Sequence, residues 1–77
     1  MKAVVTVIGK DMVGILAKVS TRCAENNANV IEVTQSVLQE LFAMIMLVDI
    51  TGLSCEFSSF SRELGDLGQT LGLSIHV

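Results

Sequence analysis

Proline, tryptophan and tyrosine are absent from the sequence, and its only aromatic residues are three phenylalanines. With so few large side chains, the hydrophobic core must consist mainly of Val, Ile, Leu and Met. Apolar residues make up 51% of the 77 residues and charged residues 17%, a composition that excludes a disordered chain. Because a chain of this length buries only about 60% of its unfolded surface, we expect one domain over residues 1–77 that gains stability by self-association.

Positive charge is also scarce. Five Lys and Arg against eight Asp and Glu give a net charge of -3, the opposite of the basic surface with which proteins bind nucleic acids. The longest apolar run covers eight residues, 41–48, whereas a membrane-spanning helix needs about 20. The apolar segment at the N-terminus ends at Gly9, which is too early for a secretion signal. We therefore expect a cytoplasmic protein with neither a nucleic acid nor a membrane as partner.

The sequence has little that could bind a metal or form a redox centre. Its two cysteines, Cys23 and Cys55, form no Cys-x-x-Cys pair, so we expect reduced thiols that pack within two predicted helices. The single histidine, His76, has no Cys, His or carboxylate at the spacing of metal ligands. No Gly-x-Ser-x-Gly turn presents a serine nucleophile. The residues predict no metal, no cofactor and no enzyme activity.

The first half of the chain predicts a strand, a helix and a second strand. Lys2–Ile8 is rich in β-branched residues and apolar on both faces, which is typical of a central strand. A helix is predicted from about Val13 to Asn26, with Asp11 as its N-cap. Val30–Leu38 alternates with polar residues and is predicted to be an edge strand. The apolar stripe of the helix consists of Met12, Ile15, Leu16, Val19 and Cys23.

The second half predicts another strand, helix and strand. Leu41–Ile50 is apolar at nearly every position, as expected of a second central strand. A helix is predicted to follow Ser54, its N-cap, and to fray near its C-terminal end because it contains Gly65 and Gly68. Its apolar stripe consists of Leu53, Phe57, Phe60, Leu64, Leu67 and Leu71. The final strand is predicted at Leu73–Val77.

The order βαββαβ predicts an α+β, ferredoxin-like fold. In this fold a four-stranded antiparallel sheet carries two helices on one face, and the first and third strands are central. Both of these strands are apolar on the face that the helices leave open. We expect a second copy of the chain to cover that face.

The segment Gly9–Gly14, which joins the first strand to the first helix, is the best candidate for a ligand site. Free N–H groups and the helix dipole at a helix N-terminus favour a bound anion by about 0.3–1 kcal/mol. Gly9 and Gly14 allow a ligand to approach the backbone closely. Asp11 is placed to accept the ammonium group of a zwitterion. The segment is therefore interpreted as an amino-acid site, and the alternative is a tight turn capped by Asp11.

Three segments together resemble ACT domains: Gly9–Val19, Asn27–Ile31 and Gln35–Val37. The resemblance covers nearly the whole chain. It is closest to small stand-alone bacterial ACT proteins, an uncharacterised group similar to the ACT modules of the glycine-cleavage regulator. ACT domains are βαββαβ regulatory modules that commonly bind an amino acid at a dimer interface. The ligand then lies between the loop after the first strand of one subunit and an Asn that opens the second strand of its partner.

This resemblance implies a function and a set of ligand-binding residues. Asp11 stands where many amino-acid-binding members carry Asn or Asp, Gly14 is the helix-opening glycine, and Asn29 is the Asn contributed by the partner. Val13 replaces a common proline, and Gly9 replaces a histidine of some serine-binding members. The implied function is that of a regulatory module, not an enzyme, which binds a free amino acid or a similar small metabolite at a homodimer interface. The implied ligand-binding residues are Gly9, Lys10, Asp11, Met12, Val13, Gly14 and Asn29.

Two other functions stay open. A protein-interaction module without a ligand would use the apolar sheet face, or would add a strand of an unknown protein partner to the edge at Val30–Leu38. An acylphosphatase-like enzyme would share the topology and hold phosphate in the same loop. That enzyme needs an Arg near the loop. Here the loop contains Lys10 but no Arg, and Arg22 lies several turns further along the helix.

Overall fold

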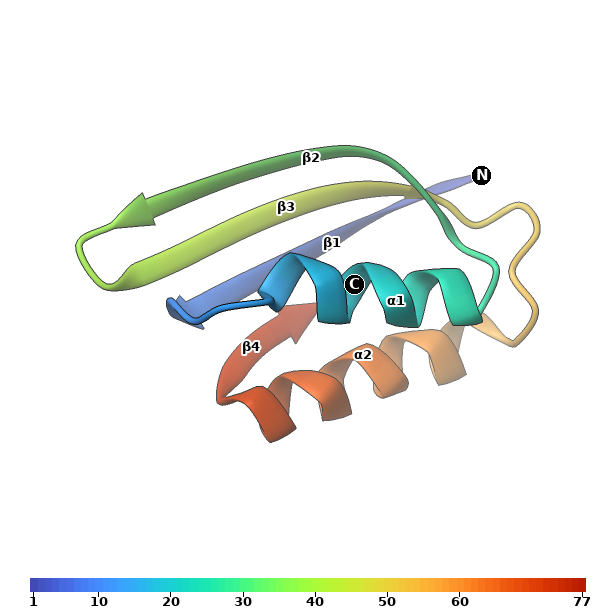
Figure 1. Cartoon of the computed structure of the whole chain (residues 1–77). Helices are drawn as coiled ribbons and strands as arrows, with labels where there is room; N and C mark the ends of the chain where they lie inside the picture. The colour runs from blue at the N-terminus through green and yellow to red at the C-terminus, as the bar shows by residue number, and fades with distance from the viewer.

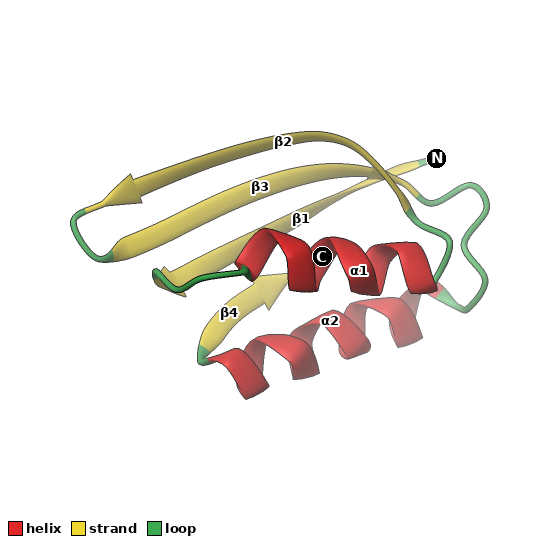
Figure 2. Ribbon diagram, in the orientation of Figure 1, coloured by secondary structure: helices red, strands yellow, loops and turns green.

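Two helices cover one face of a four-stranded antiparallel sheet in the computed structural model, which describes all 77 residues (Figure 1). The strand order is β2-β3-β1-β4, so that β1 and β3 are central and β2 is an edge strand. The predicted α+β, ferredoxin-like fold is therefore confirmed, and Figure 2 shows both helices on the same side of the sheet. The elements are β1 (Lys2–Lys10), α1 (Ile15–Glu25), β2 (Asn29–Leu38), β3 (Leu41–Asp49), α2 (Phe57–Leu71) and β4 (Leu73–His76).

The central pair of strands, β1 and β3, forms nine antiparallel residue pairs. They run from Lys2 opposite Asp49 to Lys10 opposite Leu41. Because successive side chains of a strand point to opposite faces, alternate residues of both strands face the helices. The fully buried ones include Val5 and Val7. This ladder fixes the length of the sheet and separates its two ends.

The core lies between this sheet and the helices. Each helix contributes one buried stripe: Ile15, Val19 and Cys23 from α1, and Phe60, Leu64, Leu67 and Gly68 from α2. Phe60 is the largest fully buried side chain, and burying a side chain of this size contributes about 1.5–3 kcal/mol. Neither helix has the length and apolar character that crossing a bilayer requires.

The predicted stripes were too long at their N-terminal ends, at Met12 and Phe57, and too wide at Leu16, which follows the buried Ile15. Met12, Leu16 and Phe57 are 42%, 37% and 45% exposed, so the prediction that they belong to the core was wrong. Met12 lies in the loop before α1, and Phe57 is the first residue of α2. Periodicity gives the face on which a residue lies, but not the point at which the helix leaves the sheet.

Both predicted N-caps were also wrong. The N-cap of α1 is Gly14 in a left-handed conformation (φ 85°), and the helix begins at Ile15 rather than near Val13. The N-cap of α2 is Glu56 rather than Ser54, so Cys55 precedes the helix instead of lying in it. The backbone N–H of Ser54 donates to the carbonyl of Asn26 (3.0 Å), which holds this segment against the end of α1.

Several apolar side chains of the central strands point away from the helices. Val4, Ile8, Leu41 and Ile45 are each 48–54% exposed, and they form the outer face of the sheet. The expectation that a second copy covers this face stays a prediction.

The two glycines of α2, Gly65 and Gly68, lie in different surroundings. A Cβ atom added at Gly68 would lie 2.8 Å from the carbonyl oxygen of Leu73 and 2.9 Å from Cγ1 of Ile75. A Cβ added at Gly65 would meet no atom within 4 Å. The two glycines were expected to let the helix fray, yet α2 continues to Leu71. Gly68 lets α2 pack closely against β4, because any larger residue would push the two apart.

We therefore predict opposite effects for two Gly→Ala substitutions in the same helix. Gly65→Ala should raise the free energy of unfolding by about 1 kcal/mol, because alanine favours a helix and the site is open. Gly68→Ala should lower it by about 1–3 kcal/mol, the usual cost of overpacking. Urea unfolding of both variants measures the difference. Stabilisation by Gly68→Ala would contradict the close packing of α2 on β4.

Candidate functional site

The loop between β1 and α1 is shorter than predicted and spans Asp11–Gly14. Gly9 and Lys10 belong to β1, where they pair with Phe42 and Leu41. A Cβ atom added at Gly9 would lie 2.5 Å from Cδ2 of Leu73, so this glycine allows β4 to pack against β1. The expectation that Gly9 and Lys10 form part of the loop was therefore wrong.

The loop is held against the hairpin that joins β2 and β3. The backbone N–H of Asp11 donates to the carbonyl of Glu40 in this hairpin (2.9 Å). From this contact the loop turns back to the start of α1, on the face of the sheet that both helices cover (Figure 1). Asp11, Met12 and Val13 are all exposed, and Val13 is 94% exposed.

This loop presents both donors and an acceptor. The N–H of Lys18 donates to the carbonyl of Gly14 (3.0 Å), and the three preceding N–H groups, of residues 15–17, have no partner within the helix. No acidic side chain lies in the first turn of α1. The carboxylate of Asp11 makes no hydrogen bond or ion pair, so it is available to a ligand.

Asn29, the remaining predicted site residue, lies at the other end of the sheet. It opens β2 opposite Asp49, whereas the loop lies at the end where Lys10 pairs with Leu41 and Leu41 pairs with Leu38. The ten residues of β2 separate the two ends, a distance of about 30 Å at the usual rise of a strand. Within one chain, the structure does not bring Asn29 together with Asp11.

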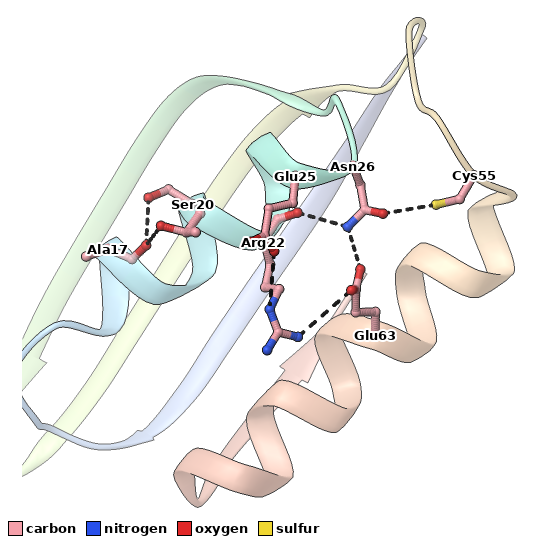
Figure 3. Close-up of polar contacts among 8 residues, drawn as sticks. Ala17, Ser20, Arg22, Glu25, Asn26, Cys55 and Glu63 are labelled. Atoms are coloured by element: carbon pink, nitrogen blue, oxygen red, sulfur yellow. Dashed lines mark hydrogen bonds and ion pairs between the residues drawn. The ribbon is translucent and has the colours of Figure 1, made fainter.

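A polar network at the far end of α1 was not predicted (Figure 3). The side-chain N–H of Asn26 donates to the carboxylate of Glu63 and to the carbonyl of Arg22 (2.9 Å), and the Cys55 thiol donates to Asn26 Oδ1 (3.4 Å). Arg22 forms ion pairs with Glu25 (3.6 Å) and Glu63 (4.0 Å). No local sequence pattern marks this network, because it joins residues that are far apart in the chain.

Comparison with known proteins decides the family. The ACT domain family model matches residues 2–77. The chain belongs to the ACT domain family. A UPF0237 protein of Methanocaldococcus jannaschii is 45% identical over 76 residues, which are 99% of this chain and 84% of that protein. The predicted resemblance to ACT domains is therefore confirmed.

Solved structures agree with this assignment. An ACT domain protein from Streptococcus pneumoniae is 39% identical, with a TM-score of 0.86 over 99% of this chain and 85% of that chain. A candidate glycine cleavage system transcriptional repressor is 23% identical, with a TM-score of 0.77 over 96% of this chain and 42% of that chain. At that identity the second likeness shows the fold alone.

In this ACT domain, polar contacts stabilise the end of the sheet that carries Asn29. Asp49, the strand partner of Asn29, accepts a hydrogen bond from the backbone N–H of Thr51 (2.9 Å). The N-terminal ammonium group donates to the Thr51 hydroxyl (2.7 Å) and lies 3.9 Å from Asp49 Oδ1. Hydrogen bonding by Thr51, through its side chain and its backbone, lowers the pKa of Asp49, and the N-terminus and Lys2 add to this effect.

The lowered pKa of Asp49 predicts a pH-dependent contribution to stability. The contribution is complete above the ordinary carboxyl pKa of about 4 and disappears as the pH falls through the lower, folded-state value. Asp49→Asn should therefore be less stable than the parent chain at neutral pH, and the difference should vanish in acid. Thermal unfolding of both proteins from pH 7 to pH 2 measures this, and a difference that stays constant in acid would contradict it.

Proposed function

We propose that this ACT domain is a regulatory module that binds a free amino acid, or a similarly small zwitterionic metabolite, between two copies of the chain. The observation that carries the proposal is the pairing of groups in the loop. The unpaired carboxylate of Asp11 belongs to the loop that leads directly into the first turn of α1, where the N–H groups of residues 15–17 have no helical partner. The carboxylate suits the ammonium group of an amino acid, and the N–H groups suit its carboxylate.

The loop alone is an open surface, because its residues are exposed. A ligand held there needs further contacts on its other side. The amide of Asn29 from the same chain cannot provide them, because it lies at the other end of the sheet. The second copy of the chain therefore has to supply the other side of the site.

The exposed edge of β2 suits this second copy. Edge strands usually carry Lys, Pro or several charges that prevent further pairing, whereas Glu32 is the only charged residue in β2 and proline is absent. The one interruption is a bulge between Val30 and Glu32. A two-fold axis near Thr34 would pair β2 with its copy in an antiparallel manner. In that arrangement Asn29 of the partner subunit lies beside the hairpin that holds the loop.

Exposed apolar residues at the same end of the molecule support this arrangement. Val37 lies on the helix side of β2, opposite Phe42 in the register, and is 53% exposed. Val13 in the loop is 94% exposed. A second copy at the β2 edge would remove part of this apolar surface from water, which is the main driving force of association.

A shared site would make the ligand a regulator without any catalysis. A ligand bound by both chains stabilises the dimer, so that ligand concentration controls the dimer population or geometry. We assign no acylphosphatase-like activity, because Arg22 pairs with Glu25 and Glu63 at the end of α1 remote from the loop.

The first test is thermal unfolding in the presence of each of the common amino acids. At one hundred times its dissociation constant, a selective ligand should add about 2.7 kcal/mol of stability, a shift of several degrees. Asp11→Ala and Asn29→Ala should each abolish the shift, since each removes one side of the site. Asp66→Ala removes an exposed carboxylate of α2 and should keep the shift. Full shifts in both site variants would refute the site.

Mixed dimers test whether the two residues act across the interface. Chains carrying Asp11→Ala and chains carrying Asn29→Ala should each fail to bind the ligand found in the first test. A mixed dimer contains one site with both substitutions and one site with neither, so co-refolding should restore binding at one site per mixed dimer. Titration calorimetry measures this stoichiometry. Absence of any recovery, with mixed dimers shown by mass spectrometry, would contradict a shared site.

A second candidate function is a protein-interaction module without a ligand. The observation that favours it is the outer face of the sheet, where Val4, Ile8, Leu41 and Ile45 stay half exposed. Such a module would show no thermal shift with any amino acid, and charged substitutions such as Ile45→Lys would abolish its partner binding while leaving the fold intact.

A further inference from the structure

Exposed apolar side chains gather at the end of the molecule that carries the loop Asp11–Gly14. Twelve large apolar side chains of the chain are exposed, and half of them lie in this loop, in the first turn of α1 or around the β2–β3 hairpin. These six are Met12, Val13, Leu16, Val37, Leu38 and Leu41. Such a concentration marks a surface that binds another chain or a ligand. Because the proposed site lies at this end, these residues bear on which amino acid it takes.

Leu16 lies on the flank of α1 that faces β2. The buried stripe of α1, which begins at Ile15, points to the sheet, and Lys18 and Thr21 line a groove shared with α2. Successive residues of a helix are about 100° apart, so Leu16 falls on the flank opposite that groove. Since α1 packs over β2 and α2 packs over β4, this flank borders the β2 edge (Figure 1).

Two further apolar residues come to the same place in the proposed dimer. Val37 lies on the helix side of β2 and is 53% exposed. When β2 pairs with its copy about an axis near Thr34, position 31 of one chain lies opposite position 37 of the other. Ile31, which is 44% exposed in the single chain, is therefore brought beside Val37 by the partner subunit.

The polar side chains nearby are directed elsewhere. Lys10 pairs with Leu41, and both point to the outer face of the sheet. Ser20, the next residue on the same flank of α1, donates its hydroxyl proton to a carbonyl of its own helix (3.2 Å). Gln35 lies two residues before Val37 in β2, a distance of about 7 Å. A polar ligand side chain at this place would lose its water without gaining a hydrogen-bond partner.

The loop and the hairpin each contribute one free carboxylate. Neither Asp11 nor Glu40 forms an ion pair within 4.0 Å. The proposed site uses Asp11 for the ammonium group of the ligand. A second carboxylate on the ligand would meet like charge from both residues. The surroundings therefore favour a side chain without charge.

From these observations we propose that the ligand is an amino acid with an aliphatic side chain, such as valine or leucine. This inference rests on the proposed function, in which the loop holds the ammonium and carboxylate groups. The aliphatic side chain then lies between Leu16 and Val37 of one chain and Ile31 of the partner subunit. Leu16 selects the ligand by its side chain and takes no part in holding the charged groups.

Matched pairs of amino acids test the ligand class on the full chain. Valine and threonine have the same shape and differ by a hydroxyl group, and leucine is close in shape to asparagine and aspartate. NMR titration of the backbone N–H signals gives each dissociation constant. We expect valine to bind about 10–100-fold more tightly than threonine, the discrimination of an apolar pocket against a hydroxyl group. Leucine should bind more tightly than asparagine, and aspartate should bind most weakly.

The outcomes separate the ligand class from the proposed function. Threonine, asparagine or lysine binding as tightly as valine and leucine would overturn the aliphatic class, while binding that depends on Asp11 would leave the proposed function intact. Absence of binding by every amino acid would refute the proposed function and the ligand class together.

Variants test the role of Leu16. Glycine has the ammonium and carboxylate groups but no side chain, so its affinity reports on the loop alone. Leu16→Ala should weaken leucine binding by about fivefold, the effect of losing contact with one or two methylene groups, and should leave glycine binding unchanged. Phe57→Ala removes a half-exposed apolar side chain near Met1, at the other end of β1, and should change neither affinity. An unchanged ratio of leucine to glycine affinity in Leu16→Ala would overturn the role of Leu16.

Discussion

The nine-residue pairing of β1 with β3 is the constraint on which the rest of the structure depends. It buries Val5 and Val7 under the helices and sets the length of the sheet. It also places the loop Asp11–Gly14 at one end and Asn29 at the other. Because β-strands are stiff and their register is fixed by the buried face, no small movement within one chain can bring the two together. A site that uses both requires two chains.

The one-sided arrangement of the helices has a second consequence. It leaves the outer face of the sheet and the edge of β2 without cover. The outer face carries half-exposed apolar side chains, and the β2 edge carries one charged residue, Glu32. The loop, the β2 edge and the β2–β3 hairpin meet at the same end of the molecule, joined by the hydrogen bond from Asp11 to Glu40. Association through that edge would therefore add stability and complete the ligand site in a single step.

The sequence was sufficient for the fold because its hydrophobic pattern is local and regular. The two-sided apolar runs identified β1 and β3 as central, and the interleaved polar residues identified β2 as an edge. The helix starts could not be predicted, because Gly14 ends the loop in a left-handed turn and Asp11 is bound to the hairpin through its backbone. The candidate loop was identified from its glycines, Asp11 and the helix N-terminus, whereas Asn29 rests on the resemblance to ACT domains alone. The polar network at the end of α1 was missed because it joins residues that are far apart in the chain, such as Asn26 and Glu63, 37 positions apart.

Light scattering of the purified chain across the micromolar range tests the central claim most directly, since a ligand site made by two chains requires a dimer. The account predicts a molar mass twice that of one chain. Adding the selective ligand should stabilise this dimer, so that it persists at lower protein concentrations. A mass of one chain at every concentration, with and without amino acids, would contradict it. In that case the loop and Asn29 could never form one site.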